Sequence, residues 1–143
     1  MDESQLPPLL LEALQILRAE RMDNTRVDAI VDNWIYLRLP NVVFDETKYP
    51  PPYSRSLWVR IPLQFPFANP HGIITAEPLN PIDGHPIKGH NPNHDMCTPV
   101  RSLGGSQYYS WTWSGEIGPG PSLRNPRDIL GVISWVERRI RQA

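Results

Sequence analysis

Cysteine is nearly absent from this sequence: its 143 residues contain a single one, Cys97. One cysteine cannot form a disulfide within the chain, and a zinc site made of four thiolates is excluded. Sparse cysteine of this kind is typical of proteins in a reducing compartment, so we expect a cytoplasmic location.

An excess of positive charge is also lacking. Lys and Arg total 14, Asp and Glu total 15, and the formal net charge is -1. Because nucleic-acid-binding domains normally carry a basic excess, we expect no nucleic-acid partner. No apolar run approaches the roughly 18 residues that a membrane-spanning helix needs, so we expect no membrane segment.

Proline, by contrast, is plentiful. The chain has 17 proline residues among 143, about twice the usual ~5%. Proline is depleted in helix interiors and central strands, so this composition predicts ordered turns and extended loops in the middle of the chain. The length is that of one ordinary domain, and we predict a single domain over residues 1–143.

Apolar residues recur at helical spacing near both ends of the chain, which predicts helices over residues 4–21 and 125–141. Between them, alternating apolar and polar residues joined by short links predict an antiparallel meander. The predicted strands occupy residues 27–43, 56–63 and 72–77. Residues 78–123 show little periodicity, and a stretch of this length either hides short elements or is functional.

The segment HPIKGHNPNHDMC (85–97) brings together three histidines, two asparagines, an aspartate and the only cysteine. Three interpretations are open. Cys97 can be a nucleophile whose thiolate fraction a neighbouring histidine raises. His85, His90, His94 and Cys97 are also acceptable zinc ligands, although their spacing matches no common zinc pattern. Alternatively, Cys97 is a small buried apolar residue without a chemical role.

In their order along the chain, these elements resemble the ubiquitin-conjugating enzyme (UBC-like) superfamily, and its divergent bacterial members in particular. That family has a helix, a meander, a proline-rich turn, a His-Pro-Asn segment, an acceptor cysteine, a Trp-Ser-Pro element and a further helix. The similar segments here are IPLQFPFANP (61–70), GIITA (72–76), His85-Pro86, Asn91-Pro92-Asn93, HDMC (94–97), Trp113-Ser114 with Pro119 or Pro121, and NPRDIL (125–130). The resemblance implies an α+β, UBC-like fold, with about four meandering antiparallel strands flanked by an N-terminal and a C-terminal helix.

The resemblance also implies a transferase that works through a thioester. Cys97 would accept the activated C-terminus of a ubiquitin-like protein from an activating enzyme and pass it to an amine or thiol of a protein target. The energy is held in the thioester, so no metal and no other cofactor is expected. Asn91 or Asn93 would stabilise the oxyanion, and His94 or Asp95 would orient the amine or accept its proton. The predicted catalytic residues are Cys97, His94, Asp95, Asn91, Asn93 and His85.

Partner contacts are expected at two places. In the family the first helix meets the activating enzyme, which here implicates Arg18 and Arg21. Trp111 and Trp113 either form a docking lip beside the site or pack the long loop onto the core. The alternative to the enzyme is a catalytically inactive binding module of the same fold, in a ubiquitin-like or antiphage defence system, with Cys97 buried and unreactive.

Overall fold

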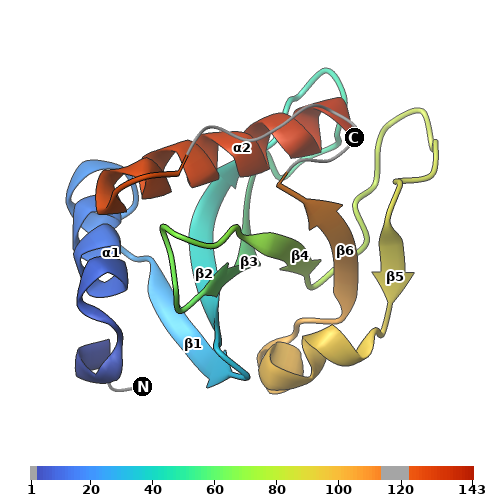
Figure 1. Cartoon of the computed structure of the whole chain (residues 1–143). Helices are drawn as coiled ribbons and strands as arrows, with labels where there is room; N and C mark the ends of the chain where they lie inside the picture. Colours follow the sequence, from blue (N-terminus) through green and yellow to red (C-terminus); the bar gives the residue numbers. More distant parts are fainter. Residues whose placement is uncertain (1–2, 114–122) are drawn as a thin grey trace.

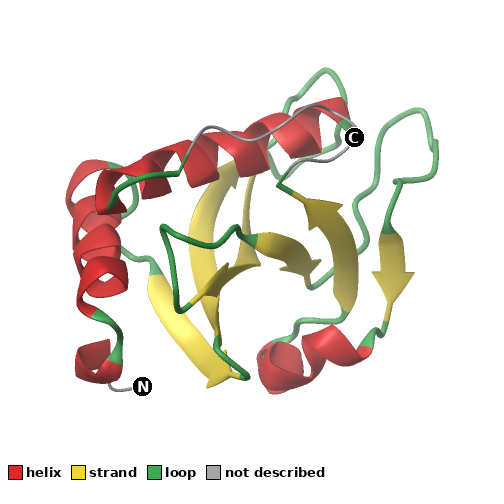
Figure 2. Ribbon diagram, viewed as in Figure 1, coloured by secondary structure: helices red, strands yellow, loops and turns green. Residues whose placement is uncertain are grey.

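The computed structural model describes residues 3–113 and 123–143. An antiparallel sheet curls through the centre of the molecule, with helices along one side and across one end (Figures 1 and 2). The strands are β1 (Arg26–Val31), β2 (Trp34–Val43), β3 (Ser54–Pro62), β4 (His71–Thr75), β5 (His90–Pro92) and β6 (Gln107–Thr112). The helices are α1 (Pro8–Glu20) and α2 (Ile129–Gln142), with short 3-10 helices η1 (Glu3–Gln5), η2 (Asp95–Leu103) and η3 (Pro126–Asp128). Within the described residues, no helix combines the length and apolarity needed to cross a membrane.

The sheet corrects the predicted fold class. Over the described residues it has six strands, in the order β1-β2-β3-β4-β6-β5, whereas a UBC-like meander of about four strands is expected from the sequence. That fold assignment is wrong. Two strands, β5 and β6, lie inside the region without periodicity, and β6 pairs with β4 on one side and β5 on the other.

One predicted strand is in fact a hairpin. The sequence predicts a single strand over 27–43, but the chain reverses at Asp32 and Asn33, which both have positive φ values, 53° and 69°. Two adjacent left-handed residues make the two-residue turn that matches strand twist, and Asp and Asn tolerate this conformation well. Val31 therefore pairs with Trp34, and β1 and β2 run antiparallel.

The main core lies between one face of the sheet and the helices α1 and α2. Alternate residues of β2 and β3 turn into it, including Ile35, Leu37, Val59 and Ile61, all with no exposed surface. Both helices contribute an apolar stripe at the spacing that the sequence predicts, because positions three and four apart share one helix face. From α1 these residues are Leu10, Ala13, Leu14 and Leu17, and from α2 Ile129, Val132, Ile133, Val136 and Ile140.

A second, smaller cluster packs on the opposite face of the sheet. It consists of Ala29, Tyr36, Trp58, Ile74, Cys97, Val100 and Tyr108. The side chains come from five strands and from η2, which lies against this face. Each of these five strands also contributes to the main core, because successive side chains of a strand point to opposite faces of the sheet and a register shift in β1 separates Val27 from Ala29.

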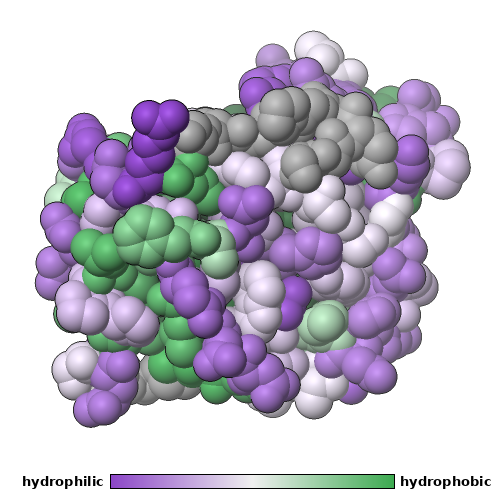
Figure 3. Space-filling view, viewed as in Figure 1, coloured by the Kyte–Doolittle hydropathy of each residue, from purple (hydrophilic) through white to green (hydrophobic). Residues whose placement is uncertain are grey.

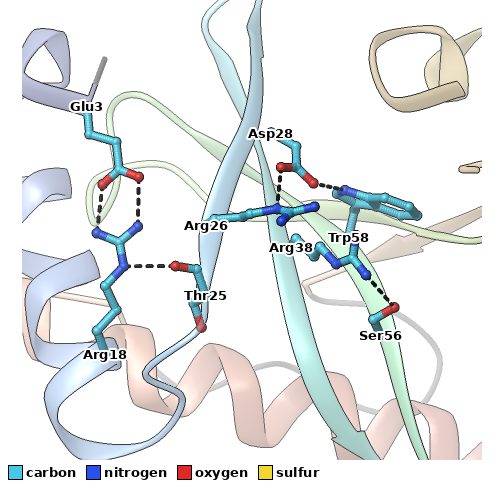
Figure 4. Close-up of polar contacts among 8 residues, drawn as sticks. All are labelled: Glu3, Arg18, Thr25, Arg26, Asp28, Arg38, Ser56 and Trp58. Atoms are coloured by element: carbon cyan, nitrogen blue, oxygen red, sulfur yellow. Dashed lines mark hydrogen bonds and ion pairs between the residues drawn. The ribbon is translucent and has the colours of Figure 1, made fainter. Parts of the chain in front are cut away.

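Polar contacts secure β1, one of the edge strands of the sheet (Figure 4). Arg18 makes two 2.7 Å bonds to the Glu3 carboxylate and donates through Nε to the Thr25 carbonyl at 2.9 Å. On β1 itself, the Asp28 carboxylate accepts from Trp58 Nε1 and from Arg26 Nε, both at 2.8 Å. The Asp28 side chain is 7% exposed, so its two donors satisfy a largely buried charge.

Candidate functional site

The predicted catalytic segment forms β5 and the beginning of η2. The first turn of η2 is capped by His94, whose Nδ1 accepts the Met96 N–H at 3.0 Å. The helix ends at Gly104, where φ is 103°, a left-handed conformation that glycine adopts without strain. Only two side chains of η2 are buried, Cys97 and Val100. These two side chains anchor the helix to the sheet.

Cys97 points into the second core rather than towards solvent. Its relative exposure is 0%, and it belongs to the cluster that includes Tyr36, Trp58 and Tyr108. Burial raises the pKa of the Cys97 thiol, and the nearby charge of Arg101 opposes this only in part. A raised pKa lowers the thiolate fraction at neutral pH, and the thiolate is the reactive form. The geometry is that of a structural thiol.

His94 and Asp95 lie on the exposed side of η2. The His94 ring stacks on Tyr108, with ring centroids 4.8 Å apart. One ring nitrogen is already used to cap η2, and the His94 carbonyl accepts from Arg101 Nη2 at 3.1 Å. His94 therefore has a structural role at the start of η2, where its side chain is exposed while that of Cys97 is buried.

The two predicted oxyanion donors hold the loop in shape. Asn91, in β5, donates through Nδ2 to the Gly89 carbonyl at 2.9 Å. Asn93 has a positive φ of 55°, and its backbone N–H donates to the Ser106 carbonyl at 2.7 Å. Both residues thus make the local side-chain and turn contacts that asparagine commonly makes.

His85 lies apart from the other predicted catalytic residues. Its Nδ1 contacts Asp83 Oδ1, and its Nε2 lies 3.0 Å from the Ala143 carbonyl oxygen, beyond the end of α2. The bond to Ala143, followed by that to Asp83, raises the pKa of His85. The structure therefore places Asp95 and Cys97 in η2, with His94 as its N-cap, and places His85 beside the end of the last helix.

The four predicted partner-binding residues are engaged within the molecule. Arg18 is bound to Glu3 and Thr25 as described, and Arg21 forms an ion pair with Glu137 of α2. The two tryptophans of the expected docking lip, Trp111 and Trp113, are 1% and 7% exposed. They pack in the main core, so the structure favours loop packing and leaves too little tryptophan surface for docking.

These tryptophans also have partners inside the core. Trp111 Nε1 donates to the Lys88 carbonyl at 2.8 Å, and the Arg139 guanidinium lies 4.7 Å from its ring centroid. Trp113 meets Trp135 of α2 with centroids 5.0 Å apart. Both rings therefore pack the segment around β6 against α2. The Ser114, Pro119 and Pro121 positions of the Trp-Ser-Pro resemblance lie outside the described residues.

Metal ligation was one of the three sequence interpretations. Over residues 3–113 and 123–143, no three His, Cys, Asp or Glu side chains gather closely enough to hold a metal ion. The four candidate ligands are dispersed: His85 lies by Ala143, His90 stacks on Tyr109, His94 caps η2, and Cys97 is buried.

A cavity that the sequence does not predict opens at one end of β3 and β4. Its volume is about 380 Å³, within the roughly 300–1,000 Å³ range of ligand sites. The lining residues are Phe44, Pro51, Pro52, Arg55, Ser56, Thr75, Ala76, Glu77, Pro78, Leu79 and Asn80. From the sequence, the prolines of this lining predict only ordered turns. Their meeting around one cavity depends on how two distant segments fold together.

The surface around the predicted catalytic segment is predominantly polar. In Figure 3 the side over η2 and β5 is mostly hydrophilic or neutral, whereas hydrophobic side chains gather on the side over α1.

Comparisons with family models, with curated proteins and with solved structures each find no match for this chain.

Proposed function

We propose that this protein is a binding module for a protein partner and that it works without a covalent step at its cysteine. The observation that carries the proposal is the complete burial of Cys97. A nucleophile must reach its substrate and must be ionised to attack. Burial opposes both requirements here, because it covers the sulfur and raises the pKa of the thiol.

The neighbouring polar groups support the same proposal. A base for acyl transfer must lie within hydrogen-bond reach of the reacting group. His85 is held at Ala143, and His94 caps η2 through Nδ1. Asn91 donates to a backbone carbonyl instead of pointing a free donor at the thiol. The single free thiol is in keeping with a cytoplasmic location, which we also propose.

One observation favours a second candidate, acyl transfer through Cys97. The helix that covers the thiol is short and is anchored by only two buried side chains. A local opening of η2 would expose Cys97 while the sheet stays folded, because short elements with few buried contacts open most easily. The protein would then accept a ubiquitin-like modifier from an activating enzyme, as the sequence resemblance implies, and transfer it to a protein target.

Intact mass spectrometry separates the two candidates. The wild-type protein and Cys97→Ala are co-expressed with the products of the genes that flank this one, and each is measured with and without thiol reductant. In parallel, the native protein is treated with a small alkylating reagent, with a denatured sample as the matched control.

A binding module should show no adduct that reductant removes, and Cys97 should be alkylated quickly only after denaturation. A protein-sized adduct on the wild type that reductant removes, and that Cys97→Ala lacks, would overturn this proposal and establish acyl transfer. Rapid alkylation of the native protein would also contradict the buried, inert thiol.

A further inference from the structure

The sheet splits at one end, between its two central strands. β3 and β4 are paired at only two positions, Trp58 with Ile74 and Val59 with Ile73. Beyond Ile74, β4 follows β6: Thr75 pairs with Gln107, and the Thr75 carbonyl accepts from the Ser106 N–H at 3.1 Å. The chain after β4 therefore moves away from β3.

β3 follows its other neighbour at this end. Arg55 pairs with Val42, and Ser54 pairs with Val43 of β2. In the described chain, no backbone hydrogen bond joins residues 54–56 to residues 76–80. Successive residues of an antiparallel strand direct their N–H and C=O groups to alternate sides. Among the residues that the structure describes, the start of β3 thus has one edge bonded to β2, and its other edge, beside the cavity, has no backbone partner.

The walls of this opening combine apolar surface with polar groups. Phe44 and Leu79 are buried side chains that line it, and the prolines at 51, 52 and 78 form its rim. The Arg55 guanidinium lies 4.2 Å from the Phe44 ring centroid and donates to Asn80 Oδ1 at 2.9 Å. Arg55 and Glu77 line the opening together, so its charged groups are balanced.

We propose that this opening binds an extended segment of a partner protein, which pairs as a short strand with the free edge of β3. The inference rests on the proposed function, and it names the site and the form of the partner. Strand addition gains affinity from main-chain hydrogen bonds and specificity from pockets for alternate side chains. The unpaired edge of β3 supplies the main-chain hydrogen-bonding groups, and the cavity beside it supplies the pocket for side chains.

The side-chain alternation of β3 specifies the partner further. Arg55 shares a face with Leu57 and Val59, which turn towards the main core, where Phe44 also lies. A strand added beside Arg55 would direct every second side chain to the same face, against Phe44 and Leu79. The partner segment therefore has apolar side chains at alternate positions. It also lacks proline where its N–H must bond to β3.

The same features explain why the free edge does not pair indiscriminately. Native sheets protect exposed edges by making them short and by flanking them with proline. Here the free edge spans only residues 54–56, and Pro51, Pro52 and Pro78 stand at its rim. Such an edge can pair with a short extended segment but not with a long strand.

The test uses a display library of random linear peptides selected on the full-length protein. Selected peptides are synthesised, and their affinities are measured for wild type, Ala76→Trp and Ala19→Trp. Ala76 is an exposed residue of the opening, so tryptophan there fills the cavity. Ala19 is an exposed residue of α1 and serves as the matched control. Thermal unfolding of both variants verifies that each is folded.

Ala76→Trp should weaken binding at least about tenfold, and Ala19→Trp should leave it unchanged. N-methylation of alternate peptide amides should weaken binding by about tenfold, because each removes a main-chain hydrogen bond. Peptides that bind Ala76→Trp as well as wild type, or that tolerate methylation at every position, would overturn the inference. A selection that yields no binder would overturn it too, and an inert Cys97 in that case would leave the proposed function standing.

Discussion

At the scale of single residues, the fate of Cys97 shows how packing decides chemistry. The cysteine stands in a segment rich in histidine and asparagine, where its neighbours in sequence favour a nucleophile. In the structure its neighbours in space are Tyr108, Trp58 and other apolar side chains of the second core. An apolar environment favours the neutral thiol, because the charged form loses its hydration there.

Substitutions at Cys97 should therefore follow the rules of a core residue. Cys97→Ala removes one buried sulfur atom and should lower the free energy of unfolding by about 1 kcal/mol. Cys97→Ser buries a hydroxyl among apolar side chains and should cost more, about 1–3 kcal/mol. Urea unfolding of the three proteins measures both values. A serine variant as stable as the alanine variant would mean that water or a polar partner reaches this position.

His85 carries a pH dependence whose sign follows from its contacts. Its pKa is raised above the ordinary value of 6.5 by the bond to Ala143 and by Asp83. Protonated His85 therefore adds stability that is complete below about pH 6.5 and is lost as the pH rises through the folded-state pKa. We expect His85→Gln to melt below wild type at about pH 5.5 and together with it at about pH 9.

Thermal melting of both proteins across this pH range measures the effect. Asp83→Asn provides the control, because it removes the carboxylate that attracts the protonated ring. The melting temperature of Asp83→Asn should fall below that of the wild type at low pH, as expected for His85→Gln. A His85→Gln deficit that is equal at both ends of the range would assign His85 a purely structural role.

At the scale of elements, η2 is the part of the described chain on which the two functional candidates differ. In η2 only Cys97 and Val100 are buried, whereas α2 has seven buried residues. Elements with few buried contacts open locally at a lower free energy than the whole molecule unfolds. Acyl transfer through Cys97 would require the thiol to become accessible by such an opening of η2 alone.

Val100→Ala should reveal this local opening. Removing two buried methyl groups from η2 should raise the alkylation rate of native Cys97 by roughly tenfold, which corresponds to about 1.4 kcal/mol. Val132→Ala makes the same change in α2, where the valine is equally buried, and should alter the rate much less. Equal increases in the two variants would mean that Cys97 is exposed only when the whole protein unfolds.

At the scale of the whole molecule, one sheet serves two cores. Tyr108 and Tyr109 are adjacent in β6, yet Tyr108 belongs to the smaller core and Tyr109 to the main core. The larger core holds both long helices, and the smaller holds η2. Because every central strand contributes to both, damage to the main core should propagate through the sheet.

Ile133→Ala tests this coupling. The residue is fully buried in α2, and its truncation should lower the free energy of unfolding by about 2–5 kcal/mol. Far-ultraviolet circular dichroism and tryptophan fluorescence should still give coincident transitions, since Trp58 and Trp135 report on the two cores. Separate transitions would contradict a single cooperative sheet.

The sequence by itself determined the elements whose own residues carry a periodic pattern. The two long helices lie where apolar residues recur at helical spacing, and the strands predicted at 56–63 and 72–77 correspond to β3 and β4. The start of the last helix is also local: Asn125 caps η3 by accepting the Arg127 N–H at 3.0 Å. Each of these signals acts within one or two turns of chain, so no distant residue is needed to read it.

Only the tertiary structure decided the number of strands, the position of Cys97 and the cavity at the end of β3. β5 has three residues, too few to show alternation, and it exists because β6 lies beside it. Cys97 is buried because η2 packs on the sheet. The inward face of this short 3-10 helix consists of only Cys97 and Val100, three residues apart, which is too few to form a recognisable pattern in the sequence. The cavity joins residues 44–56 to residues 75–80. Such features depend on contacts between distant segments, which the local spacing of residues does not record.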